Sequence, residues 1–207
     1  LAQPAAAAAP PVTSFTDLRR GVGIFKGSGG TIGYLVNGAG AMAIDSQFAN
    51  TAEIALAGLK QRAPQGVEML LNTHHHGDHT GGNKAYGVSK IVAHANCLKS
   101  HKAVTEEAKT VDQQAYATAT FTDTWTEKFG DETIEGRYFG AGHTGGDAVY
   151  HFQRANVMHM GDLLFNPGFT TYKPKQLGEV AALLARVAYV GFVYDLLPVL
   201  FPEWWTP

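Results

Sequence analysis

The chain has 207 residues, of which 45% are hydrophobic and 16% are charged. This is enough apolar material for one sizeable core and too few residues for two full domains. The formal net charge of -2 disfavours proteins that bind nucleic acid or an anionic membrane. The single cysteine, Cys97, excludes an internal disulfide and a cysteine-rich zinc module, so histidine and carboxylate groups are left to bind a metal.

The N-terminal segment is rich in alanine and proline, a composition that cannot build a core. We therefore expect a flexible segment over residues 1–15 and one domain over residues 16–207. The small, polar start is typical of a secreted protein after cleavage of its signal, with a linker as the alternative. This start predicts a periplasmic or secreted protein. A cytoplasmic location is the alternative.

The domain begins with short apolar runs separated by glycine-rich or Asn-Gly turns, which is typical of antiparallel strands. The predicted strands, in chain order, are 21–26, 31–36, 41–45, 67–71, 90–93, one or two over 121–139, 148–153 and 157–160. Helices are predicted over 51–62, where apolar residues recur at helical spacing, and over 96–109. This order favours two sheets with helices outside over one parallel wound sheet.

One further apolar stretch, residues 180–200, is interrupted by Arg186, Asp195 and Pro198. The interruptions come before the stretch reaches the roughly 20 apolar residues that span a bilayer. It therefore predicts a core helix and a strand, and no membrane segment.

The buried strand 67–71 ends directly in the sequence Asn-Thr-His-His-His-Gly-Asp-His. A turn here can aim His74 and His76 at one metal ion while Asp78 and His79 face a second position nearby. Neutral imidazole suits zinc or iron, and a carboxylate adds charge neutralisation and an oxygen ligand. A polar surface loop is the alternative, and the Gly-Asp-His-Thr-Gly-Gly sequence after a buried strand argues against it.

Three motifs in order resemble the metallo-β-lactamase fold superfamily: His74-x-His76-x-Asp78-His79, then His143 in Gly-His-Thr-Gly-Gly, then Asp162 in Met-Gly-Asp. The resemblance covers residues from about 21 to 166. It implies an α/β (α+β) fold, a four-layer αβ/βα sandwich of two mixed β-sheets with helices on both outer faces. The metals would lie at one edge of this sandwich.

The resemblance also implies roles for the site residues. The implied ligands are His74, His76 and His143 for the first metal, and Asp78 and His79 for the second. Asp162 would bridge the two metals, or serve as the carboxylate ligand of a single one. Asp45 matches the superfamily's early aspartate and would hold the metal-binding loop. We also expect a catalytic role for Asp78, and the residues that bind substrate stay unassigned.

The sequence departs from the superfamily's pattern near its end. The superfamily usually supplies one more histidine to the second metal, and no histidine follows His159 in this sequence. Glu203 as a substitute oxygen ligand, a weak second metal, an altered C-terminal sequence and a mononuclear site are the alternatives. In the persulfide dioxygenase branch, one iron takes ligands equivalent to His74, His143 and Asp162.

The other histidines and the cysteine are expected to have structural roles. We expect His75 at the surface or next to the ligands, His159 in the core or next to the ligands, and Cys97 as a buried free thiol. The histidines without a partner at ligand spacing are His94, His101 and His151. Candidates for lining a substrate pocket are Phe165, Asn166, Phe169, Tyr172, Lys173, Lys175, Trp204 and Trp205, for which a solvated loop or core packing is the alternative.

The predicted function is that of a metal-dependent hydrolase with a dinuclear zinc site, acting through a metal-bound hydroxide on an ester, thioester, lactone or amide such as a β-lactam. The alternatives are a mononuclear iron oxidoreductase similar to persulfide dioxygenases, and a metal-binding module with a disabled second site. The expected cofactor is one or two zinc ions, with iron as the alternative. The expected partner is a small-molecule substrate, with no nucleic acid and no membrane, and the oligomeric state stays open.

Overall fold

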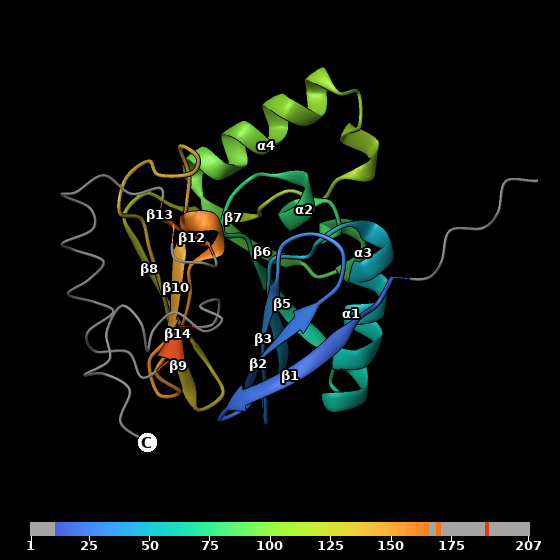
Figure 1. The fold of residues 1–207 in the computed structure, drawn as a ribbon, viewed down its shortest axis with the longest axis vertical. Coiled ribbons are helices and arrows are strands. Elements are labelled where there is room, and N and C mark those ends of the chain that lie inside the picture. The colour runs from blue at the N-terminus through green and yellow to red at the C-terminus, as the bar shows by residue number, and fades with distance from the viewer. Residues whose placement is uncertain (1–10, 166–168, 171–188, 191–207) are drawn as a thin grey trace, which may run out of the picture.

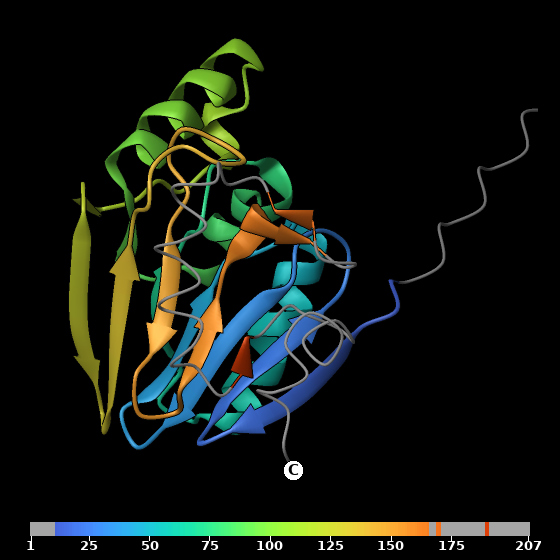
Figure 2. The same cartoon turned by 60° about the vertical axis from the view of Figure 1, so that its left-hand side comes forward.

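The computed structural model describes residues 11–165, 169–170 and 189–190. Two sheets face each other in this part of the chain, and helices α1 and α3 lie on the outer face of the first sheet (Figure 1). The first sheet has seven strands in the order β1-β2-β3-β4-β5-β6-β7, and the second has five in the order β14-β11-β10-β9-β8. A view turned by 60° shows the same two layers from the side of the second sheet (Figure 2).

The seven strands of the first sheet are β1 (Ser14–Arg19), β2 (Val22–Lys26), β3 (Ile32–Asn37), β4 (Gly40–Ile44), β5 (Val67–Leu71), β6 (Lys90–His94) and β7 (Ala119–Phe121). The first four pair antiparallel, and β4 to β7 pair parallel. Parallel neighbours need a crossover connection, and helices provide it here. These helices are α1 (Ala49–Arg62), α2 (Gly77–Thr80), α3 (Asn83–Tyr86) and α4 (Ala95–Glu107), with a 3-10 turn η1 (Val111–Gln113).

The second sheet consists of β8 (Thr124–Phe129), β9 (Glu132–Arg137), β10 (Val149–Phe152), β11 (Val157–His159) and β14 (Tyr189–Val190). A 3-10 turn, η2 (Gly161–Leu163), follows β11 and leads into a short hairpin of β12 (Leu164–Phe165) and β13 (Phe169–Thr170). This turn places Asp162 immediately after a buried strand of the second sheet. The hydrogen-bonded pairs from β8 to β11 are antiparallel.

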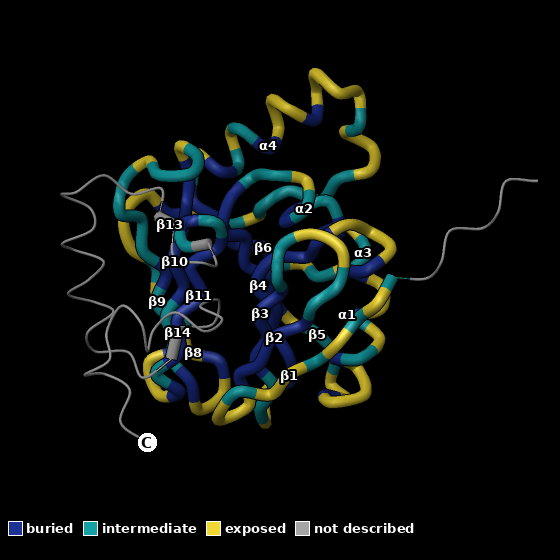
Figure 3. Tube along the Cα trace, in the orientation of Figure 1, coloured by how far each residue is buried: buried dark blue, intermediate teal, exposed yellow. Residues whose placement is uncertain are grey.

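The core has two parts because the first sheet is covered on both faces. Met42 and Ile44 of β4 pack between the sheets, whereas Ala41 and Ala43 face α1. Such alternation follows from the two-residue period of a strand. All five residues of β4 are buried, as expected for a strand between two layers. Figure 3 shows the buried residues concentrated along the strands of the two sheets.

The predicted fold class is confirmed, since the structure is a mixed α+β sandwich of two sheets. Strand β1 begins at Ser14, so Ser14 and Phe15 belong to the sheet rather than to the segment expected to be flexible. Of the stretch predicted as a core helix and a strand, only the backbone of β14 lies among the described residues. No helix in the described ranges is long and apolar enough to cross a membrane.

Candidate metal centre

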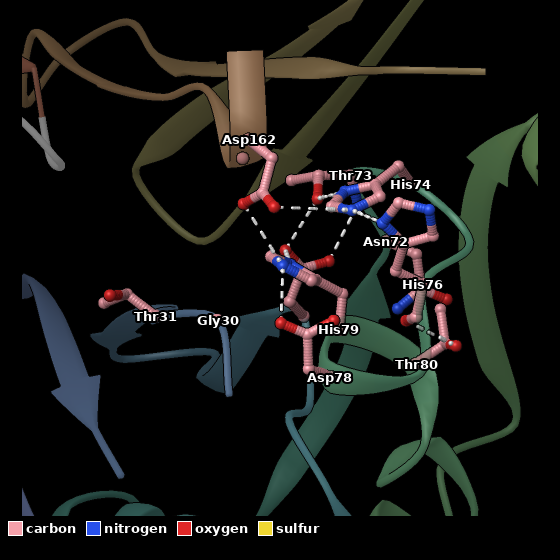
Figure 4. A network of polar contacts seen from close by, with 12 residues as sticks. Gly30, Thr31, Asn72, Thr73, His74, His76, Asp78, His79, Thr80 and Asp162 are labelled. Carbon is pink, nitrogen blue, oxygen red and sulfur yellow. Dashed lines mark hydrogen bonds and ion pairs between the residues drawn. The ribbon is translucent and has the colours of Figure 1, made fainter. Parts of the chain in front are cut away.

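The histidine-rich loop begins at the C-terminal end of β5, a strand in the interior of the first sheet. The main chain leaves the strand at Asn72 and turns at once into helix α2, in which the amides of His79 and Thr80 both donate to the carbonyl of His76 at 3.0 Å. This tight turn brings His74, His76 and His79 back toward one another. Figure 4 shows Asp162 above His79, with His74 and His76 to one side.

Four side chains form the first half of the centre. Their ligand atoms all lie within 4.8 Å of one another, and they belong to His74, His76, His143 and Asp162. Nδ1 of His76 lies 3.2 Å from Nε2 of His74 and 3.0 Å from Nε2 of His143. A tetrahedral zinc ion with Zn–N bonds of about 2.0–2.1 Å would have its ligand atoms roughly 3.3 Å apart. The spacing of the three imidazoles therefore fits a shared metal ion.

Two further side chains form the second half. Nε2 of His79 lies 3.2 Å from Oδ1 of Asp162 and 3.5 Å from Oδ2 of Asp78. This nitrogen is buried and makes no hydrogen bond of good geometry, so it is an unsatisfied polar atom that a metal would satisfy. Asp162 directs its other oxygen, Oδ2, toward His143 at 3.5 Å and His74 at 3.8 Å. Asp162 therefore faces both halves of the centre.

Asp45 contacts Thr73, next to the first half, and His79 in the second half. One of its oxygens accepts the amide of Thr73 at 2.8 Å, and the other accepts the hydroxyl of Thr73 at 2.7 Å and faces Nδ1 of His79 at 2.8 Å. The carboxylate is fully buried, and Asp45 has a φ of 63°, a conformation that non-glycine residues rarely adopt. The buried contacts fix this strained backbone in place.

Thr73 determines which ring nitrogen of His74 carries the proton. The hydroxyl of Thr73 gives its only proton to Asp45, so it acts as an acceptor toward Nδ1 of His74, 3.0 Å away. Nδ1 of His74 must then carry the proton, which leaves the lone pair of Nε2 directed at the other imidazoles. Metal-binding histidines commonly depend on such a partner on the second ring nitrogen.

The two halves differ in their electrostatics. Burial, followed by the neighbouring imidazoles beginning with His79, lowers the pKa of His74 far below its usual value. Burial also lowers the pKa of His76, and His143 adds to the effect. For His79, burial alone would lower the pKa, but the nearby carboxylates of Asp45 and Asp162 outweigh it and raise the pKa to about 10. Burial would raise the pKa of Asp162, yet its contacts with His79 lower it.

A glycine loop between β2 and β3 covers the second half. The amide of Gly30 donates to the carbonyl of Asp78 at 3.0 Å, and the side-chain amide of Gln47 donates to the carbonyl of Gly30 at 2.5 Å. A Cβ atom at Gly30 would lie 2.1 Å from Cε1 of His79, so only glycine fits here. This role of Gly30 was not predicted, although the Gly-Ser-Gly-Gly run over residues 27–30 is a sequence signal of close backbone approach.

The remaining histidines do not belong to the group of side chains that could hold a metal. His94 accepts the amide of Asn96 at the start of α4, and His101 contacts the side chain of Gln114. His159 is buried, with its Nε2 atom 3.3 Å from the carbonyl of Thr31. His75 is half-buried, and the centre of its ring lies 4.8 Å from that of His76. His151 is also half-buried, with its Nε2 atom 3.4 Å from Oδ1 of Asn156.

Cys97 is buried in α4, and burial raises the pKa of its thiol well above the usual value. A thiol with a raised pKa is a poor nucleophile at neutral pH. Most of the predicted pocket residues lie outside the described residues: Asn166, Tyr172, Lys173, Lys175, Trp204 and Trp205. Glu203, the predicted substitute ligand of the second metal, also lies outside them. For Phe165 and Phe169 only the backbone, in β12 and β13, is described.

Comparisons with known proteins agree with this geometry. A family model described as the metallo-beta-lactamase superfamily matches residues 27–203, so the chain belongs to this superfamily, as its motifs predicted. No curated protein matches the chain at a significant level.

Solved structures of similar fold include a metallo-beta-lactamase from Pontibacter korlensis, with a TM-score of 0.71, 18% identity, and coverage of 86% of this chain and 89% of that one. The metallo-beta-lactamase IND-7 has a TM-score of 0.71 at 20% identity, with 88% and 90% covered. The DIM-1 metallo-beta-lactamase has a TM-score of 0.70 at 13% identity, with 94% and 95% covered. At these identities the likeness establishes the fold alone.

Proposed function

We propose that this protein is a metal-dependent hydrolase with a two-ion centre that opens an ester, thioester, lactone or amide. The observation that carries the proposal is the position of Asp162, whose two oxygens face the His74–His143 half and His79 respectively. The donor set of imidazoles and carboxylates suits zinc. When bound, two such ions lower the pKa of water toward neutrality and polarise the oxygen of the group under attack.

The protein's own residues hold and orient this chemistry. Three histidines would bind the first ion, and Asp78 with His79 would bind the second. Asp78 has a side chain that is 40% exposed, more than the 22% of Asp162 and the fully buried Asp45. Its Oδ2 atom is therefore the carboxylate oxygen best placed to accept a proton from water or to deliver one to a leaving group.

A covalent route through cysteine does not fit the structure. Cys97 is buried and its pKa is raised, so its thiol stays protonated at neutral pH. The nucleophile in this proposal is water, and the residues of the centre position it.

A mononuclear iron site is the second candidate. Asp162 lies among the histidines of the first half, and two histidines with one carboxylate form the facial ligand set of many non-haem iron oxygenases. This candidate requires only His74, His143 and Asp162, and it makes Asp78 and His79 dispensable for metal binding.

The test combines metal content with turnover. Elemental mass spectrometry is applied to protein purified without added metal or a histidine tag, followed by assays on chromogenic esters, thioesters, lactones and β-lactams. About two zinc ions per chain with turnover supports the proposal. One iron with oxygen consumption on a persulfide supports the second candidate. A bound metal without any turnover contradicts both and indicates a binding module.

A further inference from the structure

A hollow opens at the end of the first sheet opposite the metal centre. It has a volume of about 420 Å³ and is lined by residues of β1, the turn into β2, β3 and the last turn of α1. Val36 on its wall pairs with Ala41 near the start of β4, whereas Asp45 follows the end of that strand. The hollow is therefore separated from the metal centre by the length of β4.

Arginine dominates the charge of this hollow. Arg19, Arg20 and Arg62 all line it, and we call it the arginine hollow. The other two arginines of the described ranges are ion-paired, Arg137 with Glu135 and Arg154 with Asp131. The described carboxylates form no such pair with the three arginines of the hollow. Their positive charge is thus not neutralised by an ion pair within the described residues, although the chain has a formal net charge of -2.

The hollow is partly preorganised. The guanidinium of Arg62 lies 4.1 Å above the ring of Phe15 and donates to the carbonyl of Gly58 at 3.3 Å. Arg20 has a φ of 50° and Gly21 a φ of 78°, so the turn between β1 and β2 has a defined left-handed geometry. Groups that are already held in place lose less entropy when a ligand binds.

One carboxylate, that of Asp17, also lines the hollow, but it already has a partner. The hydroxyl of Tyr34 donates to Oδ1 of Asp17 at 2.5 Å. Burial first, and Asp17 second, raise the pKa of Tyr34, so this hydroxyl remains a donor across the neutral range. Three arginines against one hydrogen-bonded carboxylate leave the arginine hollow positive.

We propose that the arginine hollow binds a small organic anion. Guanidinium groups bind carboxylate and phosphate through paired, charge-assisted hydrogen bonds. The apolar walls formed by Leu18, Val22 and Val36 would contact the uncharged part of the same molecule. This binding site is independent of the reaction at the metal centre.

Nuclear magnetic resonance tests the proposal on the full chain. Isotope-labelled protein is titrated with benzoate, with phenyl phosphate and, as an uncharged control, with benzyl alcohol, while the amide signals of Gly21 and Val36 are followed. We expect saturable shifts with an anion and none with the alcohol. A response to benzoate alone assigns a carboxylate ligand, and a response to phenyl phosphate alone assigns a phosphate ligand. The absence of saturable shifts with both anions would overturn the proposal.

Matched variants show whether the arginines carry the binding. Arg62→Met keeps an aliphatic contact with Phe15 without the charge, and Arg20→Asn suits the left-handed backbone. We expect the double variant to bind at least about tenfold more weakly, because charge-assisted hydrogen bonds are lost. Arg154→Gln, at an ion-paired arginine, should bind as the wild type does.

Unchanged affinity in the double variant, or an equal loss in Arg154→Gln, would contradict the proposal. Circular dichroism checks that each variant folds. If the double variant does not fold, the affinity of Arg19→Gln, at the exposed end of β1, is compared with that of Arg154→Gln. Unchanged affinity in Arg19→Gln, or an equal loss in Arg154→Gln, would then contradict the proposal.

Discussion

The two halves of the candidate metal centre place histidine in opposite electrostatic settings. His74 is buried among other imidazoles, which lowers its pKa, whereas His79 lies between the carboxylates of Asp45 and Asp162, which raise its pKa to about 10. A histidine with a lowered pKa is already neutral and ready to bind a metal. A histidine with a raised pKa must lose a proton first. We therefore expect the first half to bind metal more strongly than the second.

Removal of one ligand from each half gives the largest expected effect. His76→Ala should abolish metal binding at the first half and reduce activity by more than about 100-fold, which exceeds the usual cost of losing a supporting contact. His79→Ala should weaken only the second ion. Metal content and turnover are measured on both variants, with His151→Ala as the control. Full activity in His76→Ala would contradict the assignment of the site.

Replacement of the carboxylate that supports both halves tests whether they are coupled. Asp45→Asn keeps the size of the side chain but replaces one acceptor oxygen with an NH2 donor, so it cannot accept the Thr73 amide, the Thr73 hydroxyl and the Nδ1 proton of His79 together. We expect metal affinity to fall about 10- to 100-fold at both halves. Competition with a chelator measures the two affinities. A loss confined to one half would show that Asp45 does not link them.

A change in the glycine loop should affect the second half alone. Gly30→Ala places a Cβ atom against the ring of His79, so we expect the second ion to be weakened and the protein to lose about 1–3 kcal/mol of stability. Gly38→Ala is the matched control, because a Cβ atom at Gly38 meets nothing within 4 Å. Zinc titration and chemical denaturation give the two readouts. Equal effects of both substitutions would contradict this role of Gly30.

The stability of the metal-free protein should depend on pH in opposite ways at the two halves. His79 has a raised pKa, so its contribution is complete below its ordinary pKa of 6.5 and is lost as the pH rises toward about 10. His74 has a lowered pKa, so its contribution is present above 6.5 and is lost as the pH falls.

Denaturation of metal-free protein across this range measures both slopes. His79→Gln should remove the alkaline slope and keep the acidic one. An unchanged alkaline slope in this variant would assign the effect to another group.

The smallest effect is expected at the thiol. Cys97→Ala should change turnover by less than about twofold, because the side chain is buried and its thiol stays protonated. The substitution should instead lower the thermal stability of the protein, because it removes a buried side chain that packs in the core. Turnover and thermal denaturation are compared with the wild type, and a large loss of turnover at unchanged stability would point to a cysteine nucleophile.

The sequence predicted the parts of the structure that depend on local patterns. The strand 67–71 is a dense apolar run, and the polar residues after it had to emerge at the end of a sheet strand. Strand β1 was not predicted because it is an edge strand whose side chains are exposed or half-buried, so its apolar pattern is weak.

Contacts between segments that are distant in the sequence could not be predicted from local patterns. Gly30 contacts His79 because the β2–β3 loop reaches across the end of the first sheet, and no spacing in the sequence encodes this approach. Likewise, Arg62 joins Arg19 and Arg20 only because the end of α1 packs beside β1. Each depends on how separate elements pack, which the sequence pattern does not specify.

Calorimetric titration of the metal-free protein with zinc at neutral pH tests the two-ion centre most directly. We expect two binding steps in the wild type, a retained strong step in His79→Gln, and no strong step in His76→Ala. A single step of one ion in the wild type that His79→Gln leaves unchanged would contradict a two-ion centre.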